Sequence, residues 1–372
     1  MTTDLSHLPT MDVASRLARL RDALPEAGCA ALVVTSLVNV RYLTGFSGSA
    51  GILLVLPDGA VLVTDGRYQL QSVEQLAAAG VDATVEIGNA AGQREALSRA
   101  AAGIGRLGLE AVHVSWARQR AFAAEWFPAT ELVPTEGLVE RLRRVKDEGE
   151  LARLRAAAAI ADEALGRVEP LLLRGVTEAD LALELDHQMG RLGALAPSFE
   201  TIVAAGPNGA KPHARPSARP IRQGELVVVD FGALVDGYHS DMTRTLCVGD
   251  PESDTLRRMV DVVSASQAAG VAAVRAGVPA ADVDRACRDV IAAAGWADAF
   301  VHSTGHGVGL DVHEAPTVAS TSTDTLAAGH VVTVEPGVYL PEHGGVRIED
   351  TVIVTDDGNL PLTSYRKDLI VR

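Results

Sequence analysis

The spacing of hydrophobic residues predicts alternating strands and helices in the first third of the chain. In residues 12–27, for example, Val13, Leu17 and Leu20 recur at helical spacing. The expected helices are 12–27, 68–79, 91–103 and 116–127. The expected strands, which are short apolar runs, are 31–35, 51–56, 60–64, 83–87, 107–109, 112–114 and 131–134. This alternation indicates an α/β domain with a partly parallel sheet.

A charged run separates this domain from a second one. Residues 140–150 read ERLRRVKDEGE and begin a long helix. We interpret the run itself as a solvated helix face. The boundary therefore divides the chain into residues 1–139 and residues 140–372. In the second part we expect helices at 147–173, 178–192, 254–276 and 280–294, a strand at 201–204, and two acidic hairpins.

The first acidic hairpin begins in the most apolar strand of the second part. Residues 227–229 are a β-branched run that ends at Asp230, and Asp236-Gly237 predicts a turn that returns Asp241 to the side of Asp230. A buried carboxylate costs roughly several kcal/mol unless a cation meets it, and two neighbouring carboxylates repel each other. Since the sequence offers no nearby lysine, a metal ion is the simplest shared cation.

The same pattern occurs again about a hundred residues later. Gly-x-x-Val-x-Val-acid ends at Asp230 in the first copy and at Glu335 in the second, and Gly-x-x-x-acid-x-Thr then supplies Asp241 and Glu349. The glycine-led segments that open the preceding helices also match. We predict an internal duplication about a pseudo-twofold axis, with two carboxylates from each half. The alternative, that buried strands often end in an acid near a turn, explains one hairpin better than two.

Histidines gather in two loop-like segments of the second part. His213 lies in one segment and His302, His306 and His313 in the other, which together hold four of the ten histidines. Glycines beside His306 let its ring approach a site closely, and loops often carry function. The Gly-x-Gly-x-Gly spacing does not predict a phosphate-binding loop, because no lysine, serine or threonine follows it. The glycines around Ser47 do not form a nucleophile elbow, so a serine hydrolase is not expected.

Composition restricts the partners and the compartment. The 372 residues are 47% hydrophobic with a formal net charge of −15, which disfavours nucleic acid or an anionic membrane as partners. Three scattered cysteines predict buried free thiols in a reducing compartment. Residues 1–16 lack the apolar core of a secretory signal, and the apolar runs are too short to span a bilayer. We expect a cytoplasmic protein.

Four carboxylates and a histidine suit two divalent ions that prefer oxygen ligands, with Mn²⁺ or Co²⁺ favoured over Zn²⁺. The set is Asp230, Asp241, His306, Glu335 and Glu349. Two ions about 3.5–4 Å apart bind a bridging water, lower its pKa and stabilise the developing oxyanion. The pattern therefore predicts hydrolysis at a carbonyl or phosphoryl centre, with the remaining histidines as hydrogen-bond donors to the oxyanion.

These motifs together resemble the pita-bread dinuclear metallopeptidases, in particular the branch of Xaa-Pro aminopeptidase (aminopeptidase P) and Xaa-Pro dipeptidase (prolidase). RYLTGFSGS at 41–49, TDGRY at 64–68 and RRVKDE at 143–148 are similar to family signatures, and the resemblance covers essentially the whole chain. It implies an N-terminal α/β domain of the creatinase/prolidase type over residues 1–139. An α+β pita-bread catalytic domain with the internal duplication follows over residues 140–372.

The resemblance also implies roles for the five ligands. Asp230 would hold one metal ion, His306 and Glu335 would hold the other, and Asp241 and Glu349 would bridge the two. Glu335 would also take the proton from the bridging water.

Four further residues match functional positions of the family. His213 and His313 match histidines that contact the substrate amide and stabilise the intermediate, while His302 and Arg347 match residues that support the site. An Xaa-Pro bond has no amide N–H, so the site must accept a tertiary amide and polarise its carbonyl. The resemblance implies a homodimer.

We predict removal of the N-terminal residue from peptides with proline at the second position. The TDGRY segment and the compact first domain favour an aminopeptidase, and a dipeptidase is the alternative. The extra first domain argues against a methionine aminopeptidase, and the intact ligands argue against a metal-free creatinase-like hydrolase. A non-catalytic peptide-binding module on the same scaffold is a third alternative, which degraded ligands would indicate.

Overall fold

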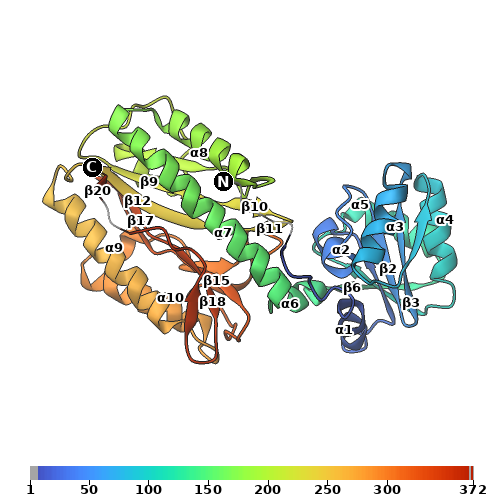
Figure 1. Ribbon diagram of the computed structural model, residues 1–372. Coiled ribbons are helices and arrows are strands. Elements are labelled where there is room, and N and C mark those ends of the chain that lie inside the picture. The colour runs from blue at the N-terminus through green and yellow to red at the C-terminus, as the bar shows by residue number, and fades with distance from the viewer. Residues whose placement is uncertain (1–6, 368–369, 372) are drawn as a thin grey trace. The chain divides into compact units, whose positions relative to one another are not determined.

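The computed structural model of the protein describes residues 7–367 and 370–371 (Figure 1). The chain forms two compact units, one of residues 10–143 and one from Arg144 onward together with the described residues up to Pro9. The sequence predicts a boundary after residue 139. In the structure, α6 (Leu138–Arg143) belongs to the first unit, because Arg143 Nη1 donates to Asn39 Oδ1 at 2.9 Å and Tyr42 OH donates to the Leu142 carbonyl at 3.0 Å.

The first unit is built on a six-stranded sheet in the order β4-β3-β2-β1-β5-β6, with β1, β5 and β6 parallel. Its strands are β1 (Ala31–Val34), β2 (Ile52–Leu56), β3 (Gly59–Thr64), β4 (Thr84–Ile87), β5 (Arg106–Glu110) and β6 (Glu131–Thr135). Its helices besides α6 are α1 (Arg16–Ala23), α2 (Leu37–Thr44), η1 (Gly66–Tyr68), α3 (Gln69–Ala78), α4 (Ala90–Ala100), α5 (Trp116–Ala121) and η2 (Phe122–Trp126). The expected α/β sheet is confirmed.

In this unit one helix was missed and one predicted strand is wrong. The helix α2 was not expected. It begins at Ser36, whose side chain accepts from the Asn39 N–H, and ends at Gly45 with φ 75°. Residues 112–114 do not form the expected strand but a turn, in which the His113 N–H donates to the Glu110 carbonyl. Val112 is 76% exposed, so its side chain does not occupy a buried position of the sheet.

The second unit consists of two similar halves. Its helices are α7 (Glu148–Val168), η3 (Glu169–Arg174), α8 (Glu178–Leu192), η4 (Gly206–Ala210), α9 (Asp254–Ala273), α10 (Ala280–Ala293) and η5 (Ala297–Ala299). The strands of the first half are β7 (Ala196–Pro197), β8 (Ile202–Ala205), β9 (Leu226–Phe231), β10 (Ala233–Val235), β11 (Tyr238–His239) and β12 (Met242–Val248). The strands later in the chain are β13 (Gly305–Gly307), β14 (Glu314–Val318), β15 (Val331–Val334), β16 (Gly337–Leu340), β17 (Gly344–Arg347), β18 (Asp350–Val354), β19 (Asn359–Pro361) and β20 (Ile370–Val371).

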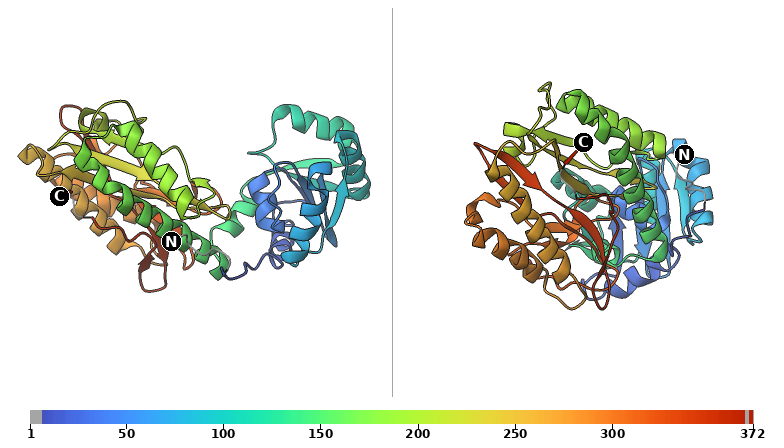
Figure 2. Two further views of the ribbon diagram at one scale, coloured as in Figure 1. Left: turned by 45° about the horizontal axis from the view of Figure 1, so that its top comes forward. Right: turned by 60° about the vertical axis from the view of Figure 1, so that its left-hand side comes forward.

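Each half places a helix pair against an antiparallel strand pair (Figures 1 and 2). Helices α7 and α8 pack with β8–β10 around one apolar core, and α9 and α10 pack with β15, β17 and β18 around another. The second helix of each pair starts beside an isolated bridge, Thr177 with Pro220 in one half and Pro279 with Thr325 in the other. These matching positions agree with the predicted duplication. The long helix expected to reach residue 173 ends at Val168 and continues as the 3₁₀ helix η3.

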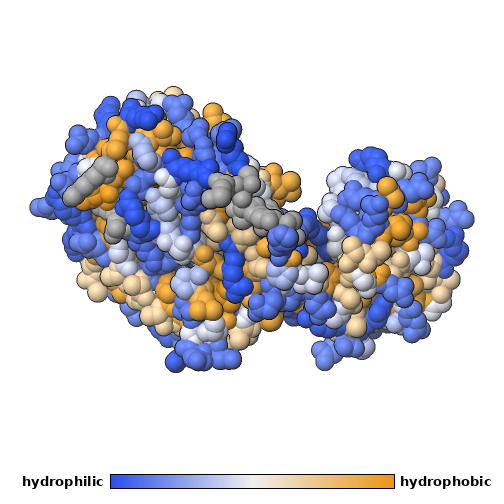
Figure 3. Space-filling view, viewed as in Figure 1, coloured by the Kyte–Doolittle hydropathy of each residue, from blue (hydrophilic) through white to orange (hydrophobic). Residues whose placement is uncertain are grey.

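On the face shown in Figure 3, hydrophilic side chains are interspersed with smaller hydrophobic areas on both units. None of the helices in the described part of the chain combines the length and apolar character needed to cross a membrane.

Candidate metal centre

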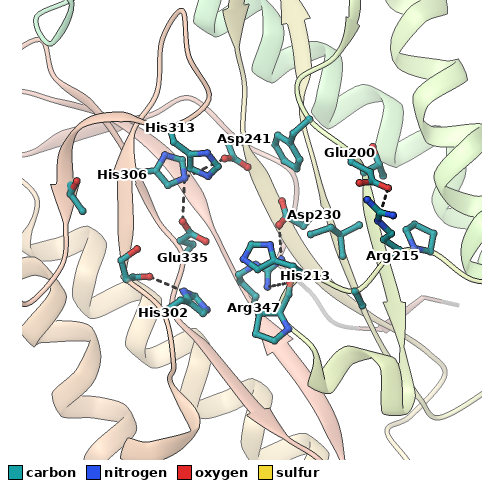
Figure 4. Close-up of a pocket in the computed structure, with 18 residues that line it drawn as sticks. Glu200, His213, Arg215, Asp230, Asp241, His302, His306, His313, Glu335 and Arg347 are labelled. Atoms are coloured by element: carbon teal, nitrogen blue, oxygen red, sulfur yellow. Dashed lines mark hydrogen bonds and ion pairs between the residues drawn. The ribbon is translucent and has the colours of Figure 1, made fainter. Parts of the chain in front are cut away.

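A pocket of about 650 Å³ lies in the second unit, and eight of the nine predicted site residues line it (Figure 4). They are His213, Asp230, Asp241, His302, His306, His313, Glu335 and Arg347. The ninth, Glu349, lies against Asp230 and Asp241 and is 1% exposed. The structure therefore brings together residues that are up to 136 positions apart, as His213 and Glu349 are (349 − 213).

Three carboxylates form the more buried side of the site. Asp230 is in β9, Asp241 directly precedes β12, and Glu349 directly precedes β18. Asp230 and Thr243 face each other across the β9–β12 ladder, so the hairpin returns Asp241 to Asp230 as predicted. One oxygen from each of Asp230, Asp241 and Glu349 lies within 4.8 Å of the others. Such a group requires positive charge nearby.

His306 and Glu335 complete the other side. His306 Nε2 lies 3.4 Å from Glu335 Oε1 and 3.6 Å from Asp241 Oδ2, so Asp241 faces both sides of the site. His306 Nδ1 lies 3.0 Å from the Gly307 carbonyl, so Nδ1–H points to that oxygen and Nε2 faces the carboxylates. Burial opposes protonation of His306, but its hydrogen bond to Glu335 and the nearby negative charge raise its pKa. A Cβ on Gly305 would lie 2.1 Å from the Thr333 carbonyl oxygen, so the strand carrying His306 can pack this closely only with glycine there.

Arg347, which the family resemblance names as a supporting residue, brings a positive charge to this site. Arg347 Nη2 donates to Asp230 Oδ2 at 2.5 Å, although the two residues are 117 positions apart. Its other donors are occupied: Nη1 by Tyr339 OH at 2.7 Å and the Pro212 carbonyl at 3.2 Å, and Nε by Thr243 Oγ1 at 3.2 Å. Arg347 therefore compensates part of the charge on Asp230, in addition to the metal ion that the sequence predicts as the shared cation.

The remaining electrostatics fit divalent cations at this site. Burial and repulsion by nearby carboxylates raise the pKa values of both Asp241 and Glu349 well above their usual range. Burial opposes the ionisation of Glu335, but its hydrogen bond to His306 and the nearby positive charge of His306 and Arg347 together outweigh burial and lower its pKa. Among the described residues, Asp230 Oδ1 and Glu349 Oε1 are buried acceptors without a hydrogen-bond donor. Acceptors of this kind, beside Nε2 of His306, match the oxygen-rich ligand set of a divalent ion, which would replace the proton that His306 shares with Glu335.

Two protein families match consecutive parts of this chain. Residues 152–356 match metallopeptidase family M24, and residues 16–145 match the creatinase/prolidase N-terminal domain. The chain belongs to metallopeptidase family M24. It is accordingly a metal-dependent peptidase with a pita-bread catalytic domain.

Relatives of this M24 peptidase align along almost the whole chain. An uncharacterized peptidase of Bacillus subtilis, YqhT, is 41% identical over 96% of this chain and 99% of its own. The structure of an Xaa-Pro dipeptidase from Bacillus anthracis superposes with a TM-score of 0.91 and 39% identity, covering 96% of this chain and 99% of its own. An X-Pro aminopeptidase from Thermotoga maritima gives a TM-score of 0.86 and 30% identity over 95% and 100%.

Three further histidines of the M24 peptidase line the pocket. The ring of His313 lies 4.3 Å from that of His306, and burial and the nearby His306 lower the pKa of His313. Burial also lowers the pKa of His302, whose Nδ1 lies 2.8 Å from the Ser303 carbonyl and whose Nε2 lies 2.8 Å from Tyr339 OH. Both shifts favour the neutral imidazole, and the contacts with Ser303 and Tyr339 occupy both ring nitrogens of His302.

The loop that carries His213 is tied down by a buried glutamate that the sequence did not reveal. Glu178 is 0% exposed, and its carboxylate accepts from the Ala205 N–H at 2.7 Å, from Asn208 Nδ2 at 3.0 and 3.1 Å, and from Ser217 Oγ at 2.5 Å. These contacts join the two ends of the segment that contains His213. Glu178 is the first residue of α8, where an acidic residue is common, so no sequence signal distinguished it.

A second group of possible ligands lies in the first unit. It contains Glu110, His113 and Glu140. Asn39 Nδ2 donates at 2.7 Å to both glutamates, and the Thr35 and Ser36 N–H groups donate to Glu110 at 2.6 and 2.9 Å. Because N–H donors already satisfy these carboxylates, the group is explained by hydrogen bonding alone.

Proposed function

We propose that this M24 peptidase is an Xaa-Pro aminopeptidase, which hydrolyses the bond between the N-terminal residue and a following proline. The observation that carries the proposal is a buried cluster of four carboxylates and His306 beside neutral histidines in one pocket. The two solved relatives named above, an Xaa-Pro dipeptidase and an X-Pro aminopeptidase, support the proline specificity. An Xaa-Pro dipeptidase is the second candidate, because the dipeptidase from Bacillus anthracis superposes with a higher TM-score than the aminopeptidase from Thermotoga maritima.

We propose that Asp230, Asp241, His306, Glu335 and Glu349 hold two divalent ions, with Mn²⁺ preferred. Oxygen-rich ligand sets favour this class of metal, and Asp241 faces both sides of the site. When bound, such ions supply an activated water and Lewis-acid stabilisation of the carbonyl oxygen.

The side chains of the chain have separate tasks in this proposal. Glu335 has a lowered pKa and is ionised near neutral pH, so its carboxylate can accept a proton from the attacking water. His313 and His213 donate N–H hydrogen bonds to the carbonyl oxygen as charge develops on it. Arg347, with Tyr339, keeps Asp230 in place, and the hydroxyl of Tyr339 in turn contacts His302 Nε2.

Substrate orientation follows from the charges of the pocket. The free α-amino group of the peptide is drawn to the carboxylates, and the proline ring packs against the apolar wall that includes Phe199, Ile202 and Pro212. Because the tertiary amide of an Xaa-Pro bond has no N–H, the site needs no acceptor for one.

The direct test compares an Xaa-Pro dipeptide with an Xaa-Pro-Yaa tripeptide in the presence of Mn²⁺, with Asp241→Asn as the control. Faster release of the first residue from the tripeptide, lost in the variant, is the expected result. Cleavage of the dipeptide alone would establish the dipeptidase instead. No turnover of either peptide by the metal-loaded protein would contradict the assignment of proline peptides as substrates.

The proposal extends to the domain that carries the site, the oligomeric state and the cellular location. We assign the metal chemistry to the catalytic domain that begins near residue 140, which contains all nine predicted site residues. We propose a homodimer, which light scattering after size-exclusion chromatography would test. We also propose a cytoplasmic location, which the three buried free cysteines support because such thiols persist in reducing compartments.

A further inference from the structure

We propose that Arg215 binds the C-terminal carboxylate of a short peptide substrate, and that Glu200 competes with that carboxylate for Arg215. This inference rests on the proposed Xaa-Pro peptidase function and adds a preference for peptides that end close to the proline.

Arg215 belongs to the wall of the catalytic pocket. It lies two residues after His213 on the same loop, and both Arg215 and Glu200 line the pocket. In Figure 4, Arg215 and Glu200 lie on the other side of Asp230 from Glu335 and His306. A peptide whose amino group sits at the carboxylates would therefore extend its other end toward Arg215.

The charges of the pocket single out Arg215 for this task. Of the two arginines that line the pocket, Arg347 is 3% exposed and bound to Asp230, Tyr339 and neighbouring groups. The Arg215 side chain is 83% exposed. It is therefore the arginine of the described pocket that a substrate can reach.

The present partner of Arg215 is replaceable. Arg215 Nε lies 3.3 Å from Glu200 Oε1, and the Glu200 side chain is 67% exposed. Exposed ion pairs of this kind contribute little stability. A guanidinium group binds a carboxylate through two parallel N–H···O bonds when the geometry allows it. A terminal carboxylate can thus take the place of Glu200 without leaving a buried charge unpaired.

This arrangement gives a way of reading the length of the peptide. A substrate that ends within a residue or two of the scissile bond presents a carboxylate to Arg215, whereas a longer or amidated chain presents a neutral group. We expect the first kind to be hydrolysed with the higher kcat/KM.

The test uses the Mn²⁺-loaded full-length enzyme and two matched pairs of peptides. One pair is Ala-Pro as the free acid and as the C-terminal amide, and the other is Ala-Pro-Ala as the free acid and as the C-terminal amide. Each pair shares one scissile bond and differs only in the terminal charge. We expect the wild-type enzyme to favour the acid in at least one pair by about tenfold in kcat/KM, which is about 1.4 kcal/mol of transition-state binding. Arg215→Gln should bring that ratio close to one, chiefly by raising KM for the acid.

Two further variants sharpen the test. Glu200→Gln removes the competing carboxylate and should raise kcat/KM for the acid more than for the amide. Arg285→Gln is the matched control, because Arg285 is a 64% exposed arginine on α10 that pairs with Asp282. It should leave the ratio unchanged.

The outcomes separate this inference from the proposed function. Equal hydrolysis of acid and amide by the wild-type enzyme, or a preference that survives in Arg215→Gln, would overturn the role of Arg215 while the peptidase assignment stands. Hydrolysis of none of the four peptides would refute the proposed function and this inference with it.

Discussion

The substitution Asp241→Asn tests whether the carboxylate cluster is destabilising until cations bind. Asparagine has nearly the shape of aspartate and removes one negative charge from the group formed with Asp230 and Glu349. We expect the metal-free variant to be more stable than the metal-free wild-type protein. The same variant should lose both stabilisation by Mn²⁺ and peptidase activity.

The magnitude follows from the separation of the charges. The ligand oxygens lie within 4.8 Å of one another. Two unit charges at that limit repel by roughly 3 kcal/mol at an effective dielectric constant of about 20, and closer charges repel more. Arg347 offsets part of the charge on Asp230, and partial protonation of Asp241 limits the repulsion further. We therefore expect a gain of about 1–3 kcal/mol in the free energy of unfolding. For a unit of this size that gain corresponds to a Tm increase of about 3–9 °C.

The sign of the pH dependence follows from the raised pKa of Asp241 in the folded protein. Below the ordinary pKa range of aspartate the group is protonated in both the folded and unfolded states, so wild type and variant should be equally stable. As the pH rises through the raised folded pKa, the unfolded state releases its proton first and the metal-free wild type loses stability. The difference in Tm between the variant and the wild type should therefore widen toward neutral and alkaline pH.

The assay is thermal unfolding in EDTA and in excess Mn²⁺ across this pH range. Mn²⁺ should raise the Tm of the wild type, because an ion that binds only the folded state stabilises it, and should have little effect on the variant. Asp261→Asn is a matched control on an exposed position of α9. A metal-free Asp241→Asn protein that is less stable than the wild type at neutral pH would refute the reasoning.

Three other changes test the surroundings of the site. Glu178→Gln should loosen the loop that carries His213 and lower kcat by about tenfold with unchanged metal content, as steady-state kinetics and metal analysis would show. Gly270→Ala should lower the free energy of unfolding by about 1–3 kcal/mol in a denaturant titration, because the new Cβ would lie 2.3 Å from Cys287 Sγ. Burial lowers the pKa of His330 to about 4, so wild-type stability should fall as the pH drops from about 6.5 to 4, and chemical unfolding of His330→Gln should show a smaller fall.

Much of the sheet and helix pattern could be predicted from local sequence, for identifiable reasons. The helix α8 matches the expected range 178–192 because Thr177 and Asp180 form a capping box and Gly193 adopts φ 114° at its end. The helix α2 escaped prediction because eight residues containing two valines resemble a strand more than an amphipathic helix. Its cap residues Ser36 and Gly45 were the available signal.

The identities of the candidate ligands could be predicted, but their supporting contacts could not. Asp230 and Glu335 follow buried β-branched runs, so a carboxylate there demands an explanation from the sequence alone. The contacts of Arg347 with Asp230 and of Tyr339 with Arg347 join different strands, and no local pattern encodes them. The sequence therefore predicted what the site contains and left open how its charges are balanced.

The repeated motif explains why one half of the duplication cannot build this site. In Gly-x-x-x-acid-x-Thr, the threonine of each half contacts the acidic residue of the other half. Thr243 Oγ1 donates to Glu349 Oε2 at 2.7 Å, and Thr351 Oγ1 donates to the Asp241 carbonyl at 2.7 Å. The two copies are thus joined across the seam between the halves, through the carboxylate of Glu349 on one side and the main chain of Asp241 on the other.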